Sequence, residues 1–223
     1  MYKSNFKLIL SLLLVLTLIG SLISCRKKNT QVEFSGKVIN PANNQAVADA
    51  AVSLASTSVQ SWVYNSNFQD IANGISSDDG IFSFLFNDQA ASAYRIYIYK
   101  SNYFSNTTLI NANDVSSERK YNADFDLFSE ATVVLHISNT NPQDNSDRIL
   151  YKILSVTQAC SNCCPTNYIE GLGNNYDTII NCTTYGNMYF IVESNITKGL
   201  NTVIRRDSVY MTPFQTTEIE IFY

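Results

Sequence analysis

Apolar and polar residues alternate with a period of two in short runs along most of the chain. The runs lie at residues 34–38, 82–86, 95–99, 133–137, 149–154, 188–192 and 218–221. Successive side chains of a β-strand point to opposite faces of the sheet, so this period predicts half-buried strands. The spacers between the runs are rich in Asn and Ser, which favour turns. We therefore predict an all-β fold made of antiparallel β-sandwiches.

The alternation also divides the chain into two parts. Asn122, Asp124 and Asp126 alternate with apolar residues, and this run is predicted to close a first sandwich at residues 32–128. A very short linker at Ser129 and Glu130 then leads to a second sandwich at residues 130–223, which has its own runs and turns. We predict two antiparallel β-sandwich domains of immunoglobulin-like or transthyretin-like type. A single larger sandwich with a long decorated loop is the alternative, because all-β domains reach this size.

The first 24 residues have the layout of an export signal. Lys3 and Lys7 make the amino end positive, residues 8–24 carry no charge, and Ser24 is a small residue at the exit. The apolar run is shorter than the roughly 20 residues that a membrane-spanning helix needs. The pattern therefore predicts export, with an uncleaved signal anchor as the alternative.

The exit itself, Leu22-Ile23-Ser24-Cys25, resembles the lipobox of bacterial lipoproteins. The resemblance implies a lipoprotein signal peptide at residues 1–24, cleavage before Cys25, and fatty acyl chains such as palmitate on Cys25. Residues 25–31 would then be a membrane tether. Two or three acyl chains hold a protein firmly on a bilayer, since each buried CH₂ contributes about 0.8 kcal/mol. Basic rather than acidic residues follow Cys25, which favours an outer-membrane location facing the periplasm.

Three motifs after the tether occur in a recognisable order. They are Gly36-Lys37-Val38, Val47 to Leu54 (VADAAVSL) and Ser76 to Phe82 (SSDDGIF). Together they resemble the carboxypeptidase regulatory-like domain, a transthyretin-like β-sandwich, although Asp49 stands where that family usually has Gly. Residues 55–74, which contain Trp62, look like an insertion. The resemblance implies a fold and no activity, because this module is an accessory in many exported proteins.

The charge of the chain argues against nucleic-acid binding. The formal net charge is −4. Loss of Lys3 and Lys7 with the signal makes it −6, and beyond the basic tether it is −9, from ten Lys and Arg against nineteen Asp and Glu. Such a body repels a phosphate backbone.

Four cysteines remain when Cys25 is assigned to the lipid: Cys160, Cys163, Cys164 and Cys182. An exported chain lies where disulfides form and persist, so we predict two structural disulfides. Adjacent Cys163 and Cys164 are poorly placed to pair with each other, so one of them should pair with Cys182 and the other with Cys160. Both such arrangements are open, and Cys160–Cys163 with Cys164–Cys182 is slightly preferred. A zinc site and a redox-active dithiol are the alternatives. The first lacks a second CxxC pair, and the second lacks a helix start after the CxxC.

Few residues suggest any other chemistry. His136 is the only histidine, and its alternation with Val133, Leu135 and Ile137 predicts a solvent-facing strand residue. Asp144, Asn145 and Asp147 place oxygen ligands in one loop and could form a weak calcium site, although turn chemistry explains the same residues. The tyrosines and Trp62 could likewise form a platform for sugar stacking. We assign no catalytic residue, no resident metal and no cofactor.

These observations predict a lipid-anchored envelope protein that acts as a non-enzymatic binding or interaction module. Its partner would be an envelope protein or a glycan, with the membrane contacted through the lipid anchor. Two alternatives remain open: a carboxylate-dependent hydrolase of envelope glycan or peptide, and a purely structural envelope lipoprotein. A cleft with two close acids would favour the hydrolase, and an exposed aromatic patch would favour the binding module.

Overall fold

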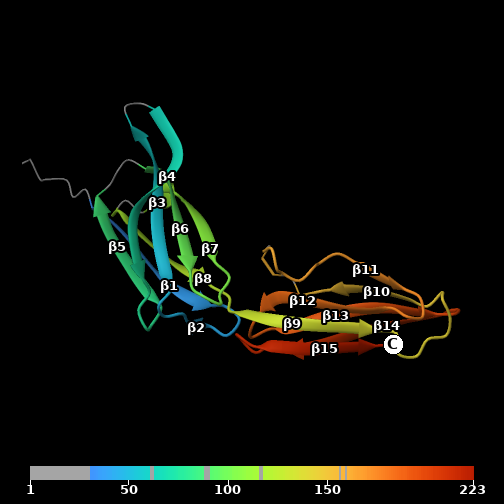
Figure 1. Ribbon diagram of the computed structural model, residues 1–223. Helices are drawn as coiled ribbons and strands as arrows, with labels where there is room; N and C mark the ends of the chain where they lie inside the picture. Colours follow the sequence, from blue (N-terminus) through green and yellow to red (C-terminus); the bar gives the residue numbers. More distant parts are fainter. Residues whose placement is uncertain (1–30, 61–62, 88–90, 116–117, 156, 159) are drawn as a thin grey trace, which may run out of the picture. The chain divides into compact units, whose positions relative to one another are not determined.

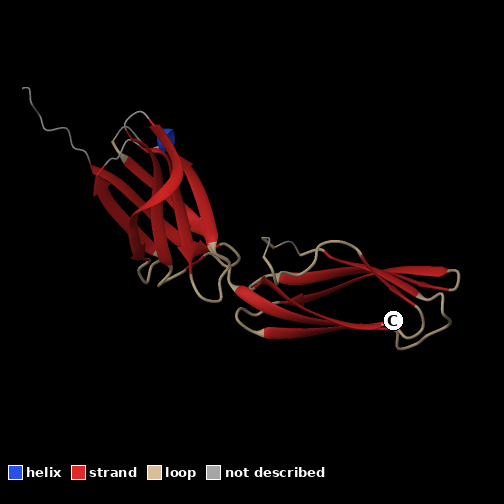
Figure 2. Ribbon diagram, turned by 45° about the horizontal axis from the view of Figure 1, so that its top comes forward, coloured by secondary structure: helices blue, strands red, loops and turns tan. Residues whose placement is uncertain are grey.

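The computed structural model describes residues 31–60, 63–87, 91–115, 118–155, 157–158 and 160–223. Strands make up nearly all of the regular structure, as Figure 2 shows, and the predicted all-β fold is confirmed. Residues Val32–Tyr223 form one compact unit. Cys25, the signal at residues 1–24 and Trp62 lie outside the described residues. Within the described part of the chain, no helix has the length and apolar character needed to cross a membrane.

Residues 31–126 form two four-stranded sheets (Figure 1). The elements in chain order are β1 (Gln31–Asn40), β2 (Gln45–Ala46), β3 (Ala51–Gln60), β4 (Val63–Ile75), β5 (Ile81–Asn87), β6 (Ala91–Tyr99), β7 (Asn106–Asn111), the 3₁₀ helix η1 (Ala112–Asp114) and β8 (Lys120–Asp126). One sheet has the order β2-β1-β5, with β8 also paired to β1, and the other has the order β4-β3-β6-β7.

The core of this first sandwich follows from the alternation in the sequence. Along β1, every second residue from Val32 to Asn40 is buried, while the residues between them are partly exposed. Phe34 packs its ring against Tyr94 of β6 and Tyr121 of β8, at centroid distances of 4.7 and 5.1 Å. Aromatic rings bury a large apolar area, so the Phe34–Tyr94 contact holds the two sheets together, while the Phe34–Tyr121 contact joins neighbouring strands of one sheet.

Residues 130–222 form a second pair of sheets (Figure 1). The strands are β9 (Glu130–Ser138), β10 (Arg148–Ile153), β11 (Ile169–Leu172), β12 (Asp177–Tyr185), β13 (Tyr189–Lys198), β14 (Asn201–Tyr210) and β15 (Thr216–Phe222). One sheet has the order β11-β10-β13-β14 and the other β12-β9-β15. A separate hydrophobic cluster, with Leu135, Ile149 and Phe190 among its fully buried members, fills the space between them.

The direction of two strand pairs differs from the sequence analysis. Most strand pairs are antiparallel as predicted, but β1 pairs with β8, and β9 with β15, in parallel. Alternation reports which face of a strand is buried and carries no information on strand direction. Residues 55–74, which look like an insertion in the sequence, lie largely in the antiparallel hairpin of β3 and β4.

The turn before β5 is the one that the Asp-Asp-Gly motif predicts. Gly80 has φ +75°, and a Cβ atom at this residue would stand 2.5 Å from the Val38 carbonyl oxygen. Glycine alone takes both the left-handed backbone and the close approach without strain. The Gly80 carbonyl oxygen accepts a hydrogen bond from Val38 N at 2.8 Å, so the turn positions β5 beside β1.

Candidate functional site

The four cysteines form two disulfides. Cys160 pairs with Cys163, and Cys164 pairs with Cys182 of β12, which is the arrangement that the sequence analysis favoured. Cys164 and Cys182 are both buried in the second core, whereas Cys160 is exposed. Backbone hydrogen bonds from Cys164 N to Thr183 O, and from Thr183 N to Asn162 O, fix the segment along β12. The segment is therefore attached to the sheet by covalent and hydrogen bonds together.

The residues suggested for calcium divide between two environments. The Asp144 carboxylate accepts a hydrogen bond from Ser146 N in a local turn, and Asn145 beside it is exposed. Asp147 is fully buried, and its Oδ2 accepts hydrogen bonds from Asn139 Nδ2 at 2.9 Å and Gln143 N at 2.8 Å. Among the described residues, no three His, Cys, Asp or Glu side chains gather in one place. Calcium binding by this loop stays a prediction.

A lysine that the sequence analysis missed lies beside Asp147. Lys198, the last residue of β13, donates from Nζ to Asn139 Oδ1 at 3.0 Å and stands 3.9 Å from Asp147 Oδ2. The hydrogen bonds from Asn139 and Gln143 hold the pKa of the Asp147 carboxyl below its ordinary value. Continuing the inward-facing positions of β13 beyond Phe190 and Val192 would have revealed a charged residue at an inward position.

Tyrosines surround this buried group. Tyr223 lies with its ring centroid 5.2 Å from Lys198 Nζ, and its hydroxyl has no hydrogen-bond partner among the described residues. Burial, reinforced by Tyr176 and Asp147, raises the pKa of Tyr223 to about 12. Burial and the hydrogen bond between the Tyr151 and Tyr176 hydroxyls also raise the pKa of Tyr151. The end of the second sandwich thus contains a buried polar cluster of Lys198, Asn139 and Asp147 with tyrosine side chains beside it.

His136 lies on the outer face of its sheet. Its Nε2 is 2.7 Å from Asp177 Oδ1, and its ring meets Phe222 edge-on at 5.6 Å. The side chain is 30% exposed, so it is only partly open to solvent and has a partner that the alternation could not reveal. Asp177 is 63% exposed, so the two residues form a pair at the protein surface.

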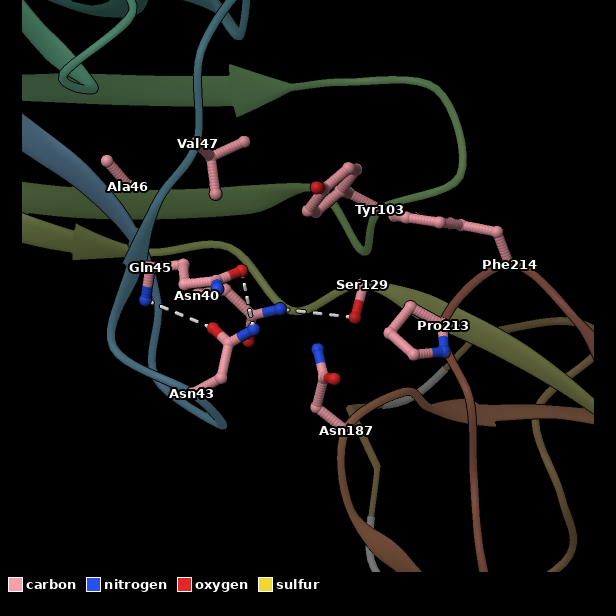
Figure 3. A pocket seen from close by; sticks show the side chains of 10 residues that line it. All are labelled: Asn40, Asn43, Gln45, Ala46, Val47, Tyr103, Ser129, Asn187, Pro213 and Phe214. Atoms are coloured by element: carbon pink, nitrogen blue, oxygen red, sulfur yellow. Dashed lines mark hydrogen bonds between the residues drawn. The ribbon is translucent and has the colours of Figure 1, made fainter.

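A pocket of about 130 Å³ lies where the chain passes from β8 to β9 (Figure 3). We call it the junction pocket. It is lined by Asn40, Asn43, Gln45, Ala46, Val47, Tyr103, Ser129, Asn187, Pro213 and Phe214. Amide side chains provide most of its polar groups, and two aromatic rings and a proline provide its apolar surface.

Local turns hold the amides of the junction pocket in place. Asn43 Oδ1 accepts from Gln45 N at 3.0 Å, and Asn43 Nδ2 donates to Gln45 Oε1 at 3.0 Å. Asn40 is buried, and its Nδ2 donates to Ser129 Oγ at 3.1 Å. Figure 3 shows the Asn187 side chain reaching toward Asn40 and Ser129. Asn187 has φ +60°, a left-handed backbone that Asn tolerates better than most residues.

The aromatic side of the pocket is formed by Tyr103 and Phe214, whose ring centroids are 5.3 Å apart. Lys100 Nζ lies 5.5 Å from the Tyr103 ring centroid, and burial raises the pKa of the Tyr103 hydroxyl. The pocket therefore offers neutral hydrogen-bonding groups and ring faces, with no carboxylate, imidazole or thiol among its described lining residues. Such a lining can bind a polar, uncharged group, and it supplies no acid–base pair. The motifs gave no sign of it, because its residues come from five separate segments.

Comparison with known proteins gives no family for the chain. No family model and no curated protein matches it, so the likenesses to a lipobox and to a carboxypeptidase regulatory-like domain stay predictions from the motifs. Solved structures match at low similarity. The TIE protein of Bacillus anthracis is similar over 87% of this chain and 34% of its own, with 10% identity and a TM-score of 0.37.

Two pilins match this chain with similarly low identities and TM-scores. A point mutant of the shaft pilin SpaA from Lactobacillus rhamnosus GG matches over 86% of this chain and 98% of its own, with 8% identity and a TM-score of 0.36. A streptococcal ancillary pilin matches over 88% and 63%, with 8% identity and a TM-score of 0.34.

Proposed function

We propose that this protein is a lipid-anchored, non-enzymatic binding module of the bacterial cell envelope, and that the junction pocket binds a neutral glycan. The lining of the junction pocket is the observation that supports this most. Sugars present hydroxyl groups that pair with amide donors and acceptors, and C–H faces that pack on aromatic rings. Asn43, Asn187, Tyr103 and Phe214 supply both kinds of contact within one pocket.

A hydrolase is supported less well by the same residues. Glycosidases use two carboxyl groups that flank the bond to be cut, roughly 5–9.5 Å apart. The described residues that line the junction pocket include no Asp or Glu. Asp124 and Asp126, and likewise Glu218 and Glu220, are exposed on the outer faces of their strands, where the alternation predicted them.

The location follows from chemistry outside the pocket. Two disulfides suit an exported protein, because the cytosol keeps most thiols reduced. The lipobox-like segment ending at Cys25 supports attachment by acyl chains, with Arg26, Lys27 and Lys28 next to the headgroups. An outer-membrane lipoprotein facing the periplasm is the location that we propose.

The test uses the lipoprotein extracted from membranes in mild detergent and applied to an array of neutral and acidic envelope glycans. We expect selective binding of neutral glycans that Phe214→Ala weakens at least tenfold. Phe222→Ala is the matched control, because Phe222 is also an exposed phenylalanine and does not line the pocket.

Equal loss in both variants, or no glycan bound by the unaltered protein, contradicts a glycan site in this pocket. Chemical crosslinking in intact cells then asks whether an envelope protein is the partner. A protein captured equally by the unaltered chain and by Phe214→Ala would place the binding surface elsewhere.

A further inference from the structure

Three side chains at the end of the second sandwich contact one another in series. Lys198 Nζ donates to Asn139 Oδ1 at 3.0 Å, and Asn139 Nδ2 donates to Asp147 Oδ2 at 2.9 Å. Lys198 Nζ is also 3.9 Å from Asp147 Oδ2. An amine, a carboxamide and a carboxyl group therefore share one small volume, although 59 residues separate the lysine from the asparagine.

This volume is largely closed to solvent. Asp147 is fully buried, Asn139 is 8% exposed, and the Lys198 side chain is 16% exposed. The Tyr223 ring lies beside Lys198 Nζ. In such surroundings, proton transfers between neighbouring groups are not diverted to bulk water, and electrostatic interactions are stronger than in solution.

The backbone holds the three residues rigidly. Asn139 follows β9 directly, its N donates to Tyr176 O at 2.9 Å, and Tyr223 N donates to Ser138 O at 3.1 Å. Lys198 ends β13 in the opposite sheet. The carboxamide carbon Cγ lies about 1.2 Å from Oδ1, so the lysine nitrogen, which is 3.0 Å from Oδ1, lies roughly 3.2–4.2 Å from Cγ. Fixed proximity of this kind lowers the barrier of an otherwise slow reaction between an amine and an amide.

We propose that Lys198 and Asn139 join in an intramolecular isopeptide bond, formed between Lys198 Nζ and Asn139 Cγ with release of ammonia. Asp147 transfers the protons. This modification is independent of what the junction pocket binds, and it would tie the two sheets of the second sandwich together covalently.

The reaction balances without an oxidant, a metal or a cofactor. The Lys198 ammonium gives one proton to the Asp147 carboxylate, and the free amine attacks Cγ. The bond from Cγ to Nδ2 breaks as Asp147 passes its proton to Nδ2. Of the two protons left on the amine nitrogen, one stays on the new amide and the other leaves with ammonia as ammonium. The carboxylate of Asp147 is regenerated.

The position of Asp147 suits this transfer. Its Oδ2 already accepts a hydrogen bond from the nitrogen that leaves, and its Oδ1 has no hydrogen-bond partner among the described residues. A buried oxygen without a partner is costly, so an unpaired carboxylate oxygen next to an ammonium calls for an explanation. Hydrogen bonds lower the pKa of the Asp147 carboxyl, so the group is ionised in the resting protein.

The intact mass of the purified protein, measured after reduction of both disulfides, tests the proposal directly. We expect a mass lower by one molecule of ammonia than the sequence and its acyl chains require. Tandem mass spectrometry should find a branched tryptic peptide that joins the fragment containing Asn139 to the fragment containing Lys198. This peptide separates the crosslink from a succinimide, which loses the same mass within one fragment.

Two variants and one control complete the test. Lys198→Arg and Asp147→Asn should each regain the mass of ammonia and lack the branched peptide. Lys100→Arg should keep both signs of the bond, because Lys100 Nζ donates to the Ala48 carbonyl oxygen and to no carboxamide among its recorded contacts. An unaltered protein with the full mass and no branched peptide overturns the proposal. A bond that forms normally in Asp147→Asn removes Asp147 from the reaction.

Discussion

At the scale of single residues, Tyr223 shows how burial sets the chemistry of a side chain. Its hydroxyl is enclosed between Tyr176 and the Asp147 region, and burial raises its pKa to about 12. An ionised phenolate there would lose its hydration and face the charge of Asp147. The folded protein therefore keeps this hydroxyl neutral over a range of pH in which the unfolded chain ionises.

This difference predicts that stability falls in alkaline solution. The unfolded tyrosine loses its proton near pH 10, and the folded one near pH 12, so the unfolded state holds fewer protons between these values. The contribution to the free energy of unfolding is complete below about pH 10 and is lost as pH rises toward 12. Urea denaturation at several pH values should give a shallower alkaline decline for Tyr223→Phe.

Tyr168→Phe is the control, because Tyr168 is exposed. Part of the decline should remain in Tyr223→Phe, since the pKa of Tyr151 is raised as well. An identical alkaline slope in Tyr223→Phe and the unaltered protein would show that Tyr223 ionises alike in both states.

At the scale of elements, the two disulfides differ in what they join. Cys164–Cys182 connects a loop to β12 inside the core and spans 18 residues, while Cys160–Cys163 spans three residues near the surface. In the chain-entropy view, a disulfide stabilises by restricting the unfolded chain, and the effect grows with the length of the closed loop. Because Cys164 and Cys182 are buried, their packing in the core adds to the stabilisation from loop closure.

We therefore expect the two bridges to contribute unequally. The double variant Cys164→Ala/Cys182→Ala should lose about 2–4 kcal/mol of unfolding free energy, and Cys160→Ser/Cys163→Ser should lose clearly less. Guanidinium denaturation of both variants and of the unaltered protein measures the difference. Equal losses would mean that neither loop length nor burial governs these bridges.

At the same scale, the sequence predicts the positions of several strands and of one turn. The runs at Phe34, Phe82 and Leu135 lie in β1, β5 and β9, because a buried face leaves a period of two in the sequence. The turn at Gly80 was predictable, since few residues other than glycine fit a left-handed backbone pressed against a carbonyl.

Contacts between residues far apart in the sequence could not be predicted in this way. Asp49 has φ +50°, a left-handed backbone that its residue type does not reveal. The contact of Lys198 with Asn139 depends on how two sheets pack, and so does the gathering of Asn43, Tyr103 and Phe214 around one pocket. Single-sequence patterns describe neighbours along a strand, whereas these groups meet across strands.

At the scale of the whole molecule, the decisive question is how the folded part is attached to the envelope. Under the proposed function, acyl chains on Cys25 hold the protein on the membrane. Dual or triple acylation is needed for stable attachment, because a single chain binds a bilayer only weakly and reversibly.

Replacement of the modified residue should remove the acyl chains. We expect the intact mass of Cys25→Ser to lack the acyl groups that the unaltered protein carries. Cys160→Ser/Cys163→Ser is the control, because these cysteines pair with each other and should leave the acylation unchanged. An unaltered protein that carries no acyl group and yet enters the detergent phase of a Triton X-114 partition would favour the uncleaved signal anchor instead.

The parallel pairing of the first and last strands in each sandwich has a mechanical consequence. β1 runs beside β8 from the Glu33–Lys120 pair to the Ile39–Asp126 pair, and β9 runs beside β15 in the same way. A pull along the chain enters at the amino end of the first strand and leaves at the carboxyl end of the last, which are opposite ends of a parallel ladder. The force then slides one strand along the other, so it strains all rungs of the ladder together instead of opening them one at a time. Each sandwich is thereby built to bear tension along the chain.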